Sequence, residues 1–147
     1  MARDLESASS INTFRQCPRK YYYHYILGFV HSIQCRWDEA VKEFEISAKK
    51  NHDNAEYLRG LGWSRFNLGD KLKGLEYLHS ANEMEPSNVH ILLDLANVYL
   101  LMLDFEKARQ YGGKALLVDP GNSLAREVVG KIEEFHKMYR HTRSRDK

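Results

Sequence analysis

Two histidines and a cysteine near the N-terminus are the residues with the clearest potential for chemistry. His24 and His31 are seven residues apart, so a helix would place them on one face, and Cys35 follows closely. Imidazole and thiolate groups bind zinc, but such sites use three or four ligands at defined spacing. The only other cysteine is Cys17. Both histidines also fall on packing positions of the repeat described below, so we expect no metal site.

A glycine-rich segment and the acidic residues are the other candidates for catalysis. Gly112-Gly113-Lys114 lacks the earlier glycine and the hydroxyl residue of a phosphate-binding loop. The carboxylates are scattered at helical spacing beside lysines, as Asp38 is beside Lys42, and such pairs contribute only about 0.2–0.5 kcal/mol. No nucleophile, base and orienting group come together. We therefore expect a non-enzymatic protein without a cofactor.

Composition excludes several classes of protein. The 147 residues carry 22 Lys and Arg against 20 Asp and Glu, and 43% are hydrophobic, as in an ordinary globular chain. Collagen, a long disordered tail and a disulfide scaffold do not fit. No apolar run approaches the roughly 18 residues of a membrane helix, and the first residues do not form a signal peptide. With two cysteines, a reducing and cytoplasmic location is expected.

The charge is distributed unevenly along the chain. Residues 1–20 have a balance of +2, residues 21–130 of −3 and residues 131–147 of +3. The basic residues between Lys137 and Lys147 are typical of a solvated helix end. Contact with an acidic partner or with RNA is the alternative. An overall basic surface for nucleic acid is not supported.

A sequence repeat of constant length organises the chain. Asn54, Asn88 and Asn122 are spaced by 34, and so are Pro86 and Pro120. Counting repeats from Tyr21, Ala55 and Val89, the eighth, twentieth and twenty-seventh positions are always small, which two closely crossing helices require. These nine residues are Gly28, Gly62, Ala96, Ala40, Gly74, Ala108, Ser47, Ala81 and Ala115.

Each repeat is predicted to be a helix, a tight turn and a second helix. Apolar residues recur at three and four positions, as in Leu92, Leu95 and Tyr99. The turns fall at Cys35-Arg36, Gly69-Asp70 and Leu103-Asp104, where Gly69 tolerates a left-handed backbone and Asp70 can cap. After Pro120-Gly121 one more amphipathic helix is expected, with Asn122 or Ser123 as its cap.

The pattern resembles the tetratricopeptide repeat family over about 102 of the 147 residues. The matches include Leu61-Gly62, Leu95-Ala96, Tyr99 and the regularly spaced prolines. Departures are Arg65 where an aromatic is usual, Gly112 in place of the second-helix aromatic, and a divergent first repeat with His24 and His52. The resemblance implies an all-α fold, a right-handed α-α superhelix.

The frame also predicts the organisation of the chain. It comprises an N-terminal segment with a short helix over 1–20, repeats over 21–54, 55–88 and 89–122, a capping helix over 123–140 and a basic tail over 141–147. In the N-terminal segment Ser9 or Ser10 would cap the helix and Cys17-Pro18 would end it. Its apolar residues could cover the open side of the first repeat. Residues 10–23 resemble a helical motif of RecB-like nucleases. The chain that follows them is helical repeat without the strands and the further cysteines of that family, so a nuclease is not expected.

The resemblance places a concave groove on the first helices of the repeats. Its candidate partner-binding residues are Tyr22, Tyr25, Phe29, Arg59, Trp63, Phe66, Asn67, Asn97 and Leu101. Family members that hold chaperone tails use a Lys/Asn/Asn/Lys/Arg clamp, of which only Asn97 is present. An aromatic and apolar groove instead suits a peptide or helix with apolar anchors.

We therefore expect an adaptor or scaffold whose partner is another protein, not a membrane or a nucleic acid. The alternatives are a small secretion-type chaperone for an exported protein and a homodimer built through the aromatic first repeat. Some groove residues could equally be core, or be covered by residues 1–20.

Overall fold

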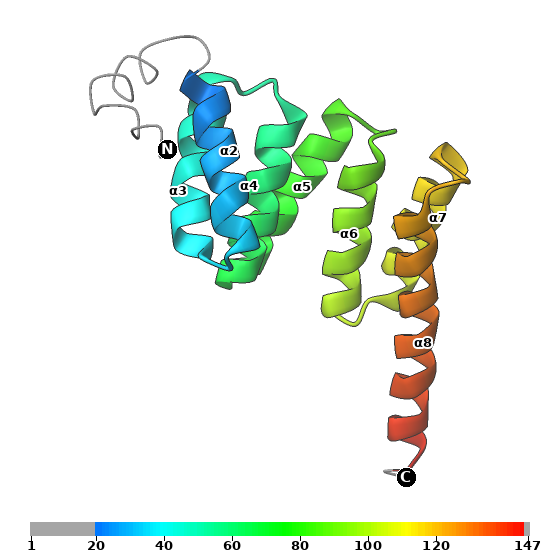
Figure 1. Cartoon of the computed structure of the whole chain (residues 1–147). Coiled ribbons are helices and arrows are strands. Elements are labelled where there is room, and N and C mark those ends of the chain that lie inside the picture. The colour runs from blue at the N-terminus through cyan, green and yellow to red at the C-terminus, as the bar shows by residue number, and fades with distance from the viewer. Residues whose placement is uncertain (1–19, 146–147) are drawn as a thin grey trace, which may run out of the picture. The chain divides into compact units, whose positions relative to one another are not determined.

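The computed structural model describes the backbone of residues 20–145 and the side chains of residues 24–144. Within that range every regular element is a helix (Figure 1). The helices are α2 (Lys20–Ile33), α3 (Trp37–Lys50), α4 (Ala55–Leu68), α5 (Lys71–Met84), α6 (Val89–Leu101), α7 (Phe105–Val118) and α8 (Ser123–Arg145). The short helix expected in residues 1–20, with its Ser9 or Ser10 cap, lies outside the described residues.

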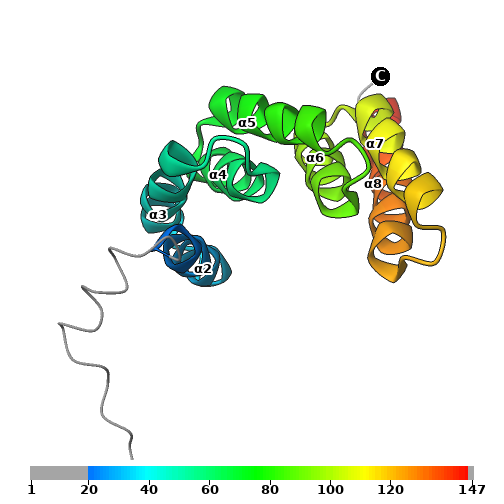
Figure 2. The same cartoon turned by 90° about the horizontal axis from the view of Figure 1, so that it is seen from above.

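The chain forms two compact units, which divide between Tyr77 and Leu78 inside α5. In the N-terminal unit, α2, α3 and α4 lie side by side, and in the C-terminal unit α6, α7 and α8 do so (Figures 1 and 2). The helix predicted over 123–140 continues to Arg145, into the segment expected to be a tail.

The three predicted turns share one backbone geometry. Cys35, Gly69 and Leu103, which occupy the same position in successive repeats, have positive φ angles of 56°, 110° and 62°. In each turn the next residue donates its amide to a carbonyl five positions earlier, at 2.9–3.0 Å. This left-handed closure satisfies carbonyls at the helix end. Glycine adopts it without strain, whereas Cys35 and Leu103 hold a conformation that costs about 1–2 kcal/mol.

The regularly spaced asparagines begin the first helix of each following repeat. The side-chain oxygen of Asn54 accepts from the amide of Tyr57 at 3.2 Å, and that of Asn88 from Ile91 at 3.3 Å. Asn122, rather than Ser123, caps α8 by accepting from Ala125 at 3.0 Å. Caps of this kind contribute about 0.5–2 kcal/mol each.

The core of the N-terminal unit is built around Phe44. Its ring lies so close to α2 and α4 that a Cβ added at Gly28 or Gly60 would lie 2.9 or 2.4 Å from it. Gly74 of α5 lies close to Gly62 and Phe66 of α4. A Cβ added at Gly74 would lie 2.7 Å from the Gly62 carbonyl oxygen. The small residues predicted from the repeat therefore mark close helix crossings.

The C-terminal unit has its own core, in which α8 covers α7. Ala108 and Ala115 of α7 and Ile132 of α8 are fully buried. A Cβ added at Gly112 would lie 2.9 Å from Val129 and 3.5 Å from Ile132. The glycine that replaces the family's aromatic thus leaves room for these two β-branched side chains.

The other departure, Arg65, is also explained by its neighbours. Its guanidinium donates to Asp70 at 3.1 Å, pairs with Glu45 of α3 and lies 5.9 Å from the ring centroid of Tyr77. These contacts join α3, α4 and α5.

The C-terminal unit fills the equivalent positions with rings. His79 hydrogen-bonds the Tyr99 hydroxyl at 2.8 Å, and Tyr99 stacks on Tyr111 at 5.6 Å. The same three positions therefore carry an ion pair in one unit and an aromatic cluster in the other.

Candidate functional site

The histidines and the cysteine that could bind a metal have separate surroundings. His24 is buried and pairs with Glu43, whereas His31 accepts from Arg36 at 2.7 Å. Cys35 is exposed in its turn. Among the described side chains no group of three or more His, Cys, Asp or Glu residues is arranged to hold a metal ion.

Tyr25 and Phe66 of the predicted groove contribute to the core of the N-terminal unit. The Tyr25 ring packs on Phe44 at 5.9 Å and on Tyr57 at 5.3 Å. Burial, and then the charge of Glu56, raise the pKa of the Tyr25 phenol above its ordinary value. Phe66 is only 6% exposed. Phe66 is therefore buried, and Tyr25 is half-buried against the core.

Phe29 and Trp63 are the predicted groove aromatics that remain accessible among the described side chains. Phe29 of α2 is 49% exposed, and Trp63 of α4 is partly exposed. Tyr25 donates to Glu56 at 3.3 Å, and the hydroxyl of Ser32 lies 3.2 Å from the hydroxyl of Ser64. The helices α2 and α4 therefore contact each other at two places along their length.

Helical spacing places both rings along that contact. Phe29 is one turn from Tyr25, and Trp63 is two turns from Glu56. We name the surface between the two contacts, with these two rings, the α2–α4 seam.

The polar groups near the seam are already engaged. Arg59, the one cation of the predicted groove, pairs with Glu56 at 2.9 Å. Asn67 donates to the backbone carbonyl of Trp63 at 2.8 Å. Since the charge of Arg59 is compensated by Glu56, the seam offers mainly apolar contact.

The remaining predicted groove residues lie elsewhere. Asn97 is half-buried and Leu101 is 60% exposed on α6, in the C-terminal unit. The side chain of Tyr22 lies outside the described residues. The structure therefore brings together the candidates of α2 and α4, and describes Asn97 and Leu101 only within their own unit.

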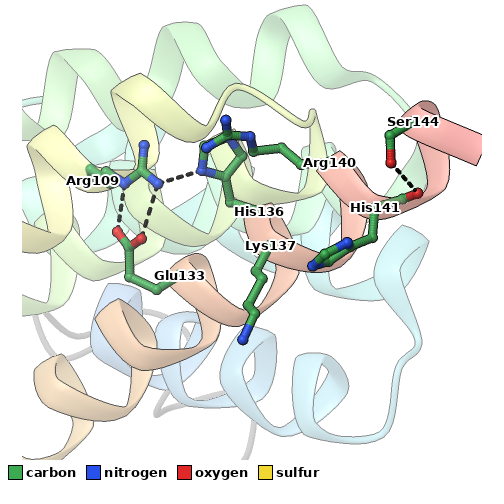
Figure 3. Close-up of a pocket in the computed structure, with 7 residues that line it drawn as sticks. All are labelled: Arg109, Glu133, His136, Lys137, Arg140, His141 and Ser144. Atoms are coloured by element: carbon green, nitrogen blue, oxygen red, sulfur yellow. Dashed lines mark hydrogen bonds and ion pairs between the residues drawn. The ribbon is translucent and has the colours of Figure 1, made fainter.

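A hollow of about 590 Å³ lies between α7 and the end of α8 (Figure 3). Its lining consists of Arg109, Glu133, His136, Lys137, Arg140, His141 and Ser144. Arg109 of α7 donates to Glu133 at 3.0 Å and also to His136. Its hydrogen bond lowers the pKa of the Glu133 carboxyl.

The basic end predicted from Lys137 onward thus includes an arginine from another helix. The sequence carries no signal for this role of Arg109, because the repeat pattern treats its position as part of an ordinary second helix.

Solved structures with the same arrangement of helices identify the fold. The first tetratricopeptide repeat domain of human RPAP3 matches with a TM-score of 0.75 at 15% identity, covering 85% of this chain and 98% of that one. The chain has the tetratricopeptide repeat fold. The predicted all-α tetratricopeptide repeat solenoid is therefore confirmed.

Two other tetratricopeptide repeat structures contain a bound partner. Spaghetti (RPAP3) with the HSP90 peptide SRMEEVD has a TM-score of 0.70 at 16% identity, covering 80% of this chain and 94% of that one. PcrH with the chaperone binding region of PopB has a TM-score of 0.67 at 21% identity, covering 81% and 96%. Identities this low show the tetratricopeptide repeat fold alone.

Sequence comparison finds one curated relative. The chain is 27% identical over 110 residues to BBSome complex member BBS4 of Bos taurus. The match covers 75% of this chain but only 21% of that protein, so the chain corresponds to about a fifth of the relative's length. No protein-family model matches the chain. In the described part of the chain, no helix combines the length and the apolar character needed to cross a membrane.

Proposed function

We propose that the chain is a non-enzymatic interaction module that binds a peptide or helix of another protein at the α2–α4 seam. The observation that carries this proposal is the accessibility of Phe29 on α2 and of Trp63 on α4, two helices that contact each other. Rigid aromatic side chains supply much of the binding energy of interfaces because they bury a large area at small entropic cost.

The chemistry of the seam favours an apolar ligand. Glu56 already accepts from Tyr25 and Arg59, so among the described side chains of the seam no uncompensated cation is left for a terminal carboxylate. The carboxylate clamp that the family resemblance describes is represented only by Asn97. A segment with two or more apolar anchors fits this surface better than an acidic chaperone tail.

A secretion-type chaperone is the second candidate function. PcrH, whose structure contains the chaperone binding region of PopB, shares the fold over 81% of this chain. A client of this kind would present an apolar stretch, which matches the character of the seam.

Selection of random twelve-residue peptides on the immobilised full chain tests the proposal. Wild-type protein is expected to enrich peptides with spaced apolar residues, and Phe29→Ala/Trp63→Ala is expected to lose them because both accessible rings are gone. Leu72→Ala/Leu117→Ala removes two residues that are 81% and 82% exposed on second helices and serves as the matched control. Equal enrichment on all three proteins would refute the seam as the site, and preferential binding of SRMEEVD would refute its apolar specificity.

A further inference from the structure

The outer face of α2 is exposed where its counterparts are buried. Val30, Ser64, Val98 and Ile132 occupy the same position of the repeat frame in α2, α4, α6 and α8. The last three are 0% exposed, whereas Val30 is 39% exposed. Ile26, one turn earlier on α2, is 40% exposed. Two β-branched residues thus line a face that the other first helices bury.

In the described part of the chain, the second helix of the preceding repeat packs on α4 and α8, and Ser64 of α4 also lies 3.2 Å from Ser32 of the preceding first helix α2. α3 packs on α4, where the ring of Phe44 meets Gly60. α7 packs on α8, where Gly112 leaves space for Val129 and Ile132. The occupant that fits α2 is therefore a helix in the same register, directly preceding it in the chain.

The frame continues upstream of α2 and supplies that register. Moving back by one repeat length from α3 (Trp37–Lys50) gives residues 3–16. The connection after α3 contains His52, and the connections after α5 and α7 contain Pro86 and Pro120 at the same position of the repeat. One repeat length before His52 is Pro18. All three prolines of the chain therefore stand at one position of the repeat.

Side-chain size at the junction agrees with this register. The position of Phe44 and Gly112 is occupied by Ser10 in the upstream segment. A small residue fits there, because Val30 is β-branched like its counterpart Ile132, which lies 3.5 Å from a Cβ added at Gly112. Glu6 occupies the repeat position that is Ala40, Gly74 and Ala108 in the later repeats, where the residues are small. That position packs on the first helix of the same repeat, as Gly74 packs on Gly62, and not on the following repeat.

We infer that residues 3–16, which lie outside the described residues, dock on the Ile26–Val30 face of α2 as the second helix of a further repeat. The occupant is this segment rather than a second copy or a partner, since it has the right length, register and small residue and ends directly at α2. The end face of the first repeat is then closed, while Phe29 at the α2–α4 seam stays available.

Amide hydrogen exchange of the full chain tests this docking. Amides of residues 3–16 are expected to exchange at least about tenfold more slowly than in a free peptide of residues 1–19, because docking protects them. Ser10→Trp should remove this protection, since the new side chain would meet Ile26 and Val30. Ser9→Trp, one residue away and off the docking face, should keep it.

A second pair of variants perturbs the α2 side. Ile26→Asp/Val30→Asp should release the segment while the amides of α6 stay protected, and Ile46→Asp/Leu72→Asp, two exposed apolar residues on second helices, should leave it docked. Unprotected amides in the wild type, or equal protection in the two tryptophan variants, would overturn the inference. Protection that disappears on dilution together with a dimer in light scattering would assign the face to a second copy and also overturn it.

Discussion

At the scale of single residues, the three inter-helix turns show how much the side chain matters. Cys35, Gly69 and Leu103 share a left-handed backbone and the same closing hydrogen bond. The sequence allowed Gly69 to be predicted as a helix end, because glycine and a following aspartate are a strong signal. The repeat frame predicted turns at Cys35 and Leu103, but their left-handed geometry could not be predicted from residue type.

Two glycine-to-alanine changes should have opposite effects on stability. A Cβ at Gly69 or at Gly113 meets no atom within 4 Å, so sterics do not separate them. Gly69→Ala should lower the free energy of unfolding by about 1 kcal/mol because φ is 110° there. Gly113→Ala, inside α7, should raise it by about 0.5–1 kcal/mol. Urea unfolding measures both, and a shift in the same direction would contradict the backbone argument.

At the scale of helices, the distribution of small residues decides which elements approach closely. The nine small positions and the helix pairs they join were predictable from the regular repeat spacing. The side chain that fills the space beside each small residue was not predictable. Phe44 packs against Gly28 and Gly60 in one unit, whereas Val129 packs against Gly112 in the other. Those pairings depend on side chains that are far apart in the sequence.

Restoring the family's aromatic residue in α7 should therefore be harmful. Gly112→Phe would push into Val129 and Ile132, and overpacking of this kind costs about 1–3 kcal/mol or more. Gly113→Phe places the same ring one residue further, where the space is open, and should cost less than about 1 kcal/mol. Thermal unfolding followed by circular dichroism compares them. Equal losses in the two variants would show that packing against α8 is not the cause.

At the scale of the whole molecule, the repeat frame predicted the fold but only part of the candidate site. The nine predicted groove residues include two that are core or largely core, Tyr25 and Phe66, because helical periodicity alone does not distinguish a concave face from a buried one. The hollow around Arg109 and the exposed face of α2 depend on which helix ends are covered. That information lies in the three-dimensional arrangement of helices rather than in any single segment.

Removing α8 should expose the last apolar face of the array. Val128 is 4% and Ile132 0% exposed, and burying such side chains contributes about 1.5–3 kcal/mol each. A chain ending at Asn122 is expected to lose several kcal/mol of stability and to aggregate, whereas a chain ending at Tyr139 keeps both contacts. Sedimentation and urea unfolding distinguish these results. A soluble and fully folded protein ending at Asn122 would contradict the role of α8 as a cap.

The matched sizes at the helix junctions also bear on how such a chain can change in evolution. A large Phe44 faces Gly60 at one junction, while Gly112 faces large residues at another. Exchanging the order of repeats by recombination would set large against large in one place and small against small in another. Although the repeats share one sequence frame, they therefore cannot be exchanged freely, because each packs well only against its own neighbours.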